Sequence, residues 1–218
     1  VHINPRVSDI APITSLKLSE KEKIIKAAAI ALRGFIKCSL RVGTTEPDFE
    51  KNVLNEVIEN GVVACVLKGL NSNAKYDIGE LLQLLAILAE EEPLQQSILK
   101  QRGIRIVIRV LQLHKNDPDV VLAATNVLRI LSQTNEGANA VSQSGGTRNV
   151  IKFAMECPAE ARFIPAAAGA AELLATLVVA SKSVDGLRES LVEQEISSAA
   201  VQLVDKFPEE ENVTRYAD

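Results

Sequence analysis

The residues that most often perform catalysis or bind metals are few in this chain, and they lie far apart. Histidine occurs at His2 and His114, and cysteine occurs at Cys38, Cys65 and Cys157. A structural zinc site needs several such ligands at short, regular spacings, and a reactive thiol usually has a nearby histidine or a CxxC partner. Neither arrangement occurs here. We therefore expect no metal site, and we expect the cysteines to be reduced residues of the core.

The sequence also lacks the short motifs that carry common enzymatic chemistry. It contains no GxSxG nucleophile elbow, no Walker A loop and no GxGxxG dinucleotide fingerprint. A glycine pair occurs at Gly145 and Gly146, but it follows a helical pattern and not a strand, as a phosphate-binding loop would. We expect a protein that is not an enzyme, with no catalytic residues and no cofactor.

Composition and charge narrow the classes of partner. The 218 residues are 47% hydrophobic and 24% charged, which is typical of a folded globular chain. The net charge is −4, only 3% of the residues are aromatic, and no cluster of Lys and Arg stands out along the sequence. Because nucleic-acid binding normally needs a basic surface or stacking aromatics, we expect no nucleic-acid partner.

One apolar stretch, residues 163–181, is long enough to cross a membrane. Glu172 lies in its middle and Pro165 near its start, and its many Ala and Gly residues favour a buried core helix. We expect membrane contact only through a partner or through an N-terminal anchor upstream of Val1. The expected location is the cytoplasm, with peripheral attachment to an organelle membrane as the alternative.

The elements that would position a binding surface repeat along the chain. A short amphipathic helix, a glycine and a second apolar helix recur in the segments 52–70, 94–112 and 138–156. The glycines, Gly61, Gly103 and Gly145, are 42 residues apart. We expect each of them to adopt the left-handed conformation between two helices, which glycine reaches without steric cost.

Each pair of helices is followed by a polar turn and a longer apolar helix, so each repeat is expected to contain three helices. Asp117 is the expected N-cap of one long helix, and no segment shows the alternation typical of strands. The stretch 159–186 makes one repeat nine residues longer, which indicates a longer helix or an insertion. After an extended segment, 1–16, we expect a single repeat domain, 17–218, with repeats at about 17–44, 45–91, 92–134, 135–182 and 183–218.

These features together resemble the armadillo repeat family. The segment 136–144 followed by GGTRNVIKF is similar to that family's first two helices, and DPDVVLAATNVLRILSQ, residues 117–133, is similar to its third helix. The resemblance implies an all-α, right-handed superhelical solenoid of about four to five repeats, the terminal ones partial. It also implies that the third helices line a concave groove for a partner. HEAT repeats, with two helices each, are the nearest alternative.

Importin-alpha-like members of this family carry an Asn late in the third helix and a Trp or another large residue one turn earlier. The Asn position corresponds here to Gly34, Ile87, Ile130 and Thr176, and the earlier position to Ile30, Gln83, Asn126 and Glu172. None of the four Asn-equivalent positions holds Asn, and none of the four earlier positions holds Trp, so we do not expect a nuclear transport receptor. The residues expected to line the groove are Gln83, Ile87, Asn126, Ile130, Glu172 and Thr176.

The expected function is that of a monomeric, non-enzymatic adaptor or scaffold that docks a partner protein in this groove. A groove of mixed apolar and neutral polar character suits a helix or a folded surface better than a basic extended peptide. The alternative is the recruiting module of a membrane-anchored or motor-associated armadillo-only protein that positions organelles. An acylation signal for such an anchor would precede Val1.

Overall fold

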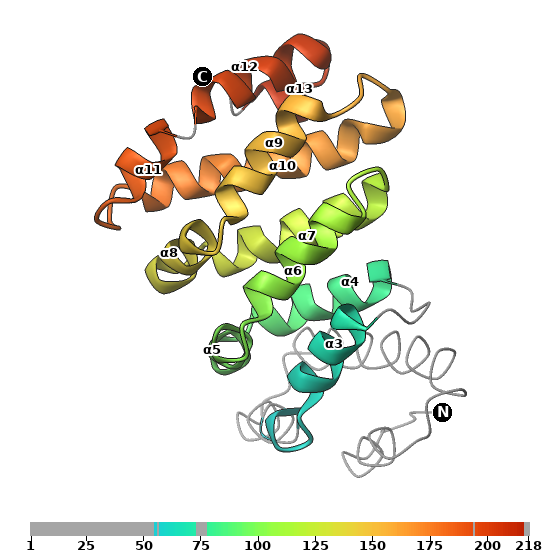
Figure 1. Ribbon diagram of the computed structural model, residues 1–218, viewed down its shortest axis with the longest axis vertical. Coiled ribbons are helices and arrows are strands. Elements are labelled where there is room, and N and C mark those ends of the chain that lie inside the picture. Colours follow the sequence, from blue (N-terminus) through green and yellow to red (C-terminus); the bar gives the residue numbers. More distant parts are fainter. Residues whose placement is uncertain (1–54, 56, 73–77, 194, 216–218) are drawn as a thin grey trace, which may run out of the picture. The chain divides into compact units, whose positions relative to one another are not determined.

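The computed structural model describes residues 55, 57–72, 78–193 and 195–215 (Figure 1). The expected segment 1–16 and the expected repeat 17–44, with Ile30, Gly34 and Cys38, lie outside these residues. Every regular element in the described part is a helix. The chain divides into two compact units, residues 1–97 and residues 98–218.

In the first unit, two described helices pack against each other, α3 (Val62–Asn71) and α4 (Ile78–Ala89). Their apolar faces are buried, and Leu82, Leu85 and Leu88 on α4 are 0% exposed. Gly69 on α3 allows the close approach, because a Cβ atom there would lie 3.0 Å from Cδ1 of Leu81. Helix α5 (Glu92–Lys100) passes from the first unit into the second.

The second unit continues the three-helix pattern that the sequence predicted. Its helices after α5 are α6 (Gly103–Leu113), α7 (Pro118–Leu131), α8 (Asn135–Gln143), α9 (Gly146–Glu156), the short 3-10 helix η3 (Ala161–Phe163), α10 (Ile164–Ala180), α11 (Leu187–Glu193), α12 (Ile196–Lys206) and α13 (Glu211–Thr214). The triplets α5–α7, α8–α10 and α11–α13 therefore follow one another as repeats.

Helices of the same rank in successive repeats of the second unit pack against each other (Figure 1). The second helices form the contacts α6–α9 and α9–α12, and the third helices form the contacts α7–α10 and α10–α13. A repeat this small cannot enclose a core alone, so stacking produces one continuous apolar interior. Leu128, Leu173 and Leu203, from three successive repeats, are each at most 1% exposed. This stacking is that of an all-α repeat protein.

The turn between the first and second helix of each repeat has a left-handed residue. It is Gly61 before α3 (φ 62°), Arg102 before α6 (φ 59°), Gly145 before α9 (φ 80°) and Glu195 before α12 (φ 58°). The prediction of a left-handed glycine between the two helices is thus confirmed for Gly61 and Gly145. It is wrong for Gly103, which is the first residue of α6, because the chain turns one residue earlier.

Replacing Arg102 by glycine should stabilise the second unit. A side chain in the left-handed region costs about 1–2 kcal/mol, and glycine removes this cost but loses more backbone entropy on folding. We expect Arg102→Gly to raise the free energy of unfolding by about 0.5–1 kcal/mol in urea denaturation. The control Arg109→Gly, inside α6, should lower it by about 1 kcal/mol. A loss of stability in Arg102→Gly would contradict the assigned turn.

The irregular repeat contains a longer helix and a longer turn, and no separate insertion. The left-handed residues are 43 residues apart from Arg102 to Gly145 and 50 apart from Gly145 to Glu195. The irregular repeat is therefore seven residues longer than the one before it, and not nine as expected. The difference arises because the flanking turns lie at Arg102 and Glu195, each one residue before the expected position. The helical segment Ala161–Ala180 has 20 residues against 14 in α7, and the turn after it is also longer, at residues 181–186.

The segment Ala161–Ala180 is long and apolar enough to cross a membrane, with a mean hydropathy of 1.9. In the structure α10 packs against α7, α9, α12 and α13. Along one face of the helix, Ala166, Ala170, Leu173 and Leu177 are 0% exposed. These contacts are those of a core helix, as its Ala-rich composition predicted.

Candidate binding surface

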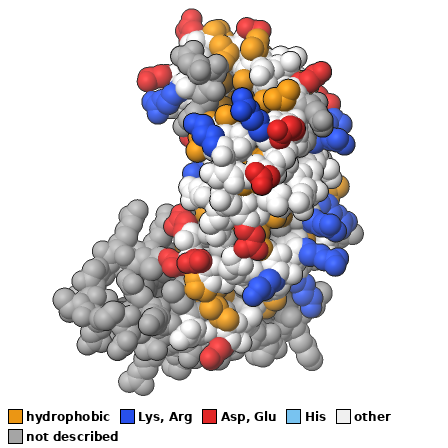
Figure 2. Space-filling model, turned by 90° about the vertical axis from the view of Figure 1, so that its left-hand side faces the viewer, with side chains coloured by type: hydrophobic (Ala, Val, Ile, Leu, Met, Phe, Trp, Pro, Cys, Tyr) orange, Lys and Arg blue, Asp and Glu red, His pale blue; other side chains and the backbone are white. Residues whose placement is uncertain are grey.

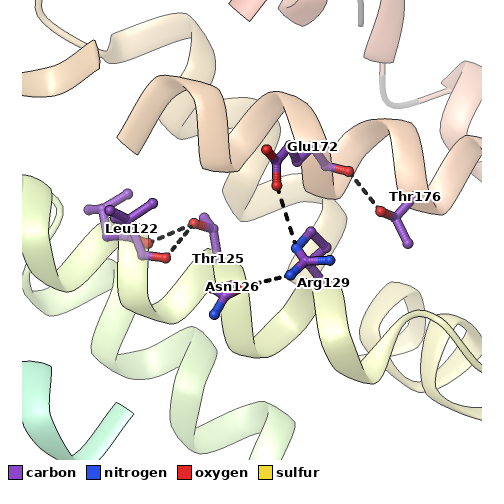
Figure 3. A network of polar contacts seen from close by, with 7 residues as sticks. Leu122, Thr125, Asn126, Arg129, Glu172 and Thr176 are labelled. Carbon is purple, nitrogen blue, oxygen red and sulfur yellow. Dashed lines mark hydrogen bonds and ion pairs between the residues drawn. The ribbon is translucent and has the colours of Figure 1, made fainter. Parts of the chain in front are cut away.

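The third helices α7 and α10 lie side by side (Figure 3). Each leaves a stripe of side chains accessible. Residues three or four positions apart on a helix share a face. The accessible side chains include Leu122, Asn126 and Arg129 on α7 and Glu172, Thr176 and Val179 on α10. We call these six residues the third-helix surface.

A glycine sets the spacing between these two helices. A Cβ atom on Gly169 of α10 would lie 2.8 Å from Oγ1 of Thr125 and 3.0 Å from Cδ1 of Leu122. Thr125 is fully buried, and its hydroxyl donates to the carbonyl oxygen of Val121 within α7 at 2.9 Å. The threonine therefore needs no partner on α10, and the absence of a side chain at 169 lets the two backbones approach.

A short polar chain crosses from α7 to α10 (Figure 3). Arg129 donates from Nη2 to Oδ1 of Asn126 at 2.8 Å, and its Nε lies 3.6 Å from Oε2 of Glu172. The side chains of Arg129 and Glu172 are 28% and 42% exposed, so this ion pair is partly solvated and contributes less than about 1 kcal/mol. Its main effect is to orient the amide of Asn126 and the carboxylate of Glu172.

Four of the six residues predicted to line a groove are accessible. Asn126, Glu172 and Thr176 belong to the third-helix surface, where Thr176 donates its hydroxyl to the carbonyl oxygen of Glu172 at 2.8 Å. Gln83 is exposed on α4, in the first unit. The second unit therefore brings three of the predicted residues together, on two neighbouring helices.

The other two predicted residues, Ile87 and Ile130, belong to the core. They are 7% and 5% exposed, so neither offers a partner appreciable surface. Successive residues on a helix are rotated by about 100°. Arg129, three residues after Asn126, stays on the accessible stripe, and Ile130 turns toward the interior. The comparison of equivalent repeat positions in the sequence did not identify Arg129. The feature that could have identified it is a charged residue within an otherwise apolar helix.

The described residues offer little for catalysis. Among them, no group of three or more His, Cys, Asp or Glu side chains could hold a metal ion. Cys157 is buried as expected, but Cys65 is exposed on α3, so the prediction of a core residue is wrong there. Burial raises the pKa of the Cys157 thiol from 9.0 to about 11, although the nearby Lys206 cation lowers it. Because the thiolate is the reactive form, Cys157 is inert at neutral pH.

Comparison with known proteins gives matches among solved structures. No family model and no curated protein matches the chain. An engineered protein matches with a TM-score of 0.73 and 19% identity over 96% of this chain and 76% of that one. A designed armadillo repeat protein in complex with the peptide (KR)4 matches with a TM-score of 0.72 and 16% identity, covering 98% and 79% of the two chains. Another designed armadillo repeat protein matches with a TM-score of 0.64 and 13% identity, over 97% of this chain and 98% of that one. Together with the stacked three-helix repeats, these matches show that the chain has an armadillo-like, all-α repeat fold.

Proposed function

We propose that this chain is a protein-binding adaptor or scaffold that docks a helix or a folded surface of a partner on its third-helix surface. The observation that carries the proposal is the composition of that surface. Leu122 and Val179 are 36% and 63% exposed, and the oriented Asn126–Arg129–Glu172 chain lies on the same helices. Amphipathic helices bind through apolar anchors with polar contacts beside them. An armadillo-like fold supports a binding role of this kind.

The charge of the surface bears on the kind of partner. One structural neighbour is a designed protein in complex with a peptide of Lys and Arg. In this chain Glu172 is the one carboxylate among the six residues of the third-helix surface, and Arg129 lies 3.6 Å from it. A strongly basic peptide would therefore meet little net negative charge. We propose a partner of mixed apolar and polar character, bound without catalysis or a cofactor.

Photo-crosslinking tests where the partner binds. A photo-reactive amino acid at position 126 or 176, introduced into the chain in its native cells, should capture the same partner. The same amino acid at Gln143, on the exposed end of α8, should not capture it. Equal capture from all three positions would contradict a binding site on the third helices.

Charge substitutions then test the affinity for the captured partner. Asn126→Arg with Thr176→Arg places two long cations on the surface and should weaken binding by about tenfold or more in calorimetry. The matched control, Asn139→Arg with Gln143→Arg, adds the same charge on the exposed side of α8 and should leave the affinity unchanged. Far-UV circular dichroism should show the same melting for both variants. Unchanged affinity in the first variant would overturn the proposal.

A further inference from the structure

The second helices α6 and α9 carry cations at equivalent positions. When their first residues are aligned, Arg105 corresponds to Arg148 and Arg109 corresponds to Lys152. All four side chains are exposed. The sequence read along its length showed no basic cluster, because the equivalent residues are 43 positions apart. In the folded chain the cations of α6 and α9 come together, since stacking places the two helices in contact.

Polar contacts also join α6 and α9 beside these cations. Gln112 donates from Nε2 to Oδ1 of Asn149 at 2.8 Å, and Nζ of Lys115 lies 3.2 Å from Oε2 of Glu156. Packed helices lie roughly 8–10 Å apart, and residues four positions apart are separated by about 6 Å along a helix. Two cations therefore lie on each of two contacting helices, and we call these four residues the basic array: Arg105, Arg109, Arg148 and Lys152.

Little negative charge offsets the basic array. Helix α6 has no acidic residue, and α9 has only Glu156, at its C-terminal end. Glu156 pairs with Lys115 at 3.2 Å and with Lys152 at 3.8 Å. Arg105 and Arg148 form no ion pair within the described part of the chain. Figure 2 shows Lys and Arg side chains gathered along one edge of the view, with few acidic side chains among them.

An exposed apolar side chain adjoins the basic array. Leu113 lies four residues after Arg109 on the same face of α6, and it is 66% exposed. A continuous phosphate backbone would need a longer basic track, and it would meet the carboxylate of Glu156 at the edge of the array. A protein segment can pair its carboxylates with the array and cover Leu113 with an apolar residue.

We propose that the basic array is a second docking surface, which binds an acidic amphipathic helix of a partner protein. Glu or Asp side chains four residues apart on that helix are separated by about 6 Å, which matches the spacing of Arg105 and Arg109. The exposed ion pairs give modest affinity but fix the orientation of the partner. The basic array lies on the second helices, so its test is independent of the third-helix surface.

The test uses the full chain and a synthetic helical probe of about five turns. The probe carries pairs of Glu four residues apart and a neighbouring stripe of Leu, and its binding is measured by fluorescence anisotropy. Arg105→Glu with Arg148→Glu should weaken binding about tenfold, as should raising NaCl from about 50 to about 300 mM. Ser198→Arg with Gln202→Arg, at the equivalent exposed positions of α12, should extend the array and strengthen binding about threefold.

A charge-matched control separates the array from the net charge of the protein. Lys182→Glu with Arg188→Glu makes the same change at two exposed positions outside α6 and α9, and it should leave probe binding unchanged. Equal weakening in both double variants would overturn the proposal. Phosphatidylserine vesicles and duplex RNA are measured in parallel. Tighter binding of either one, sensitive to Arg105→Glu with Arg148→Glu, would overturn the assignment to a protein helix.

Discussion

Gly137→Ala is expected to lower the free energy of unfolding by about 3 kcal/mol or more. Gly137 lies in the first turn of α8, where its backbone N–H donates to Oγ1 of the N-cap Thr134 at 3.2 Å. A Cβ atom there would overlap the carbonyl oxygen of Leu131 and lie 2.7 Å from its carbonyl carbon. These are backbone atoms at the end of α7, so relief requires the junction between α7 and α8 to open.

Urea denaturation followed by circular dichroism measures this effect. The matched control is Gly145→Ala, because Gly145 has a φ of 80° but its nearest neighbour to an added Cβ is Nδ2 of Asn149 at 3.8 Å. The control should lose about 0.5–1 kcal/mol, because the backbone strain of alanine is partly offset by its smaller loss of backbone entropy on folding. If Gly145→Ala proved more destabilising than Gly137→Ala, the packing of α8 against the end of α7 would be wrong.

Phe163→Ala is expected to lower the free energy of unfolding by about 3–5 kcal/mol. Phe163 is 1% exposed and is among the largest fully buried side chains of the described residues. It ends η3 and directly precedes α10, which contacts α7, α9 and α12. Removing the ring leaves a cavity at the start of a helix that packs against several neighbours.

The control for this cavity is Arg162→Ala. The guanidinium carbon of Arg162 lies 4.9 Å from the centre of the Phe163 ring, and the Arg162 side chain is 62% exposed. An exposed cation–π contact contributes about 0.5–1 kcal/mol, so Arg162→Ala should have a small effect in the same denaturation experiment. Losses of similar size in the two variants would show that the buried ring contributes little.

Local features of the fold were predictable because they depend on neighbouring residues. Apolar spacing predicted the helices, and Asp117 is confirmed as the N-cap of α7, with its carboxylate accepting from the N–H groups of Asp119 and Val120 at 3.2 and 3.3 Å. The turn before α6 was misplaced because glycine was assumed to mark it. Arg102 adopts the left-handed conformation instead, since stacking of the flanking helices outweighs a strain of about 1–2 kcal/mol.

The candidate surface was predictable only in part. Asn126 and Thr176 were identified from their place in the repeat, and they are accessible. Ile87 and Ile130 were expected on the same surface, but both are buried. Ile130 directly follows the accessible Arg129, and a difference of one residue rotates a side chain by about 100°. Such a rotation decides between core and surface, and the repeat pattern alone does not resolve it.

By itself, the sequence determined the helices, the three-helix repeat and the scarcity of catalytic groups, because helix periodicity, capping and composition are local properties. Tertiary structure decided which distant residues meet. Arg129 reaches Glu172, and the cations of α6 and α9 come together, only because helices of equal rank pack against each other. That packing depends on steric fit, such as Gly169 against Thr125, which no single segment contains.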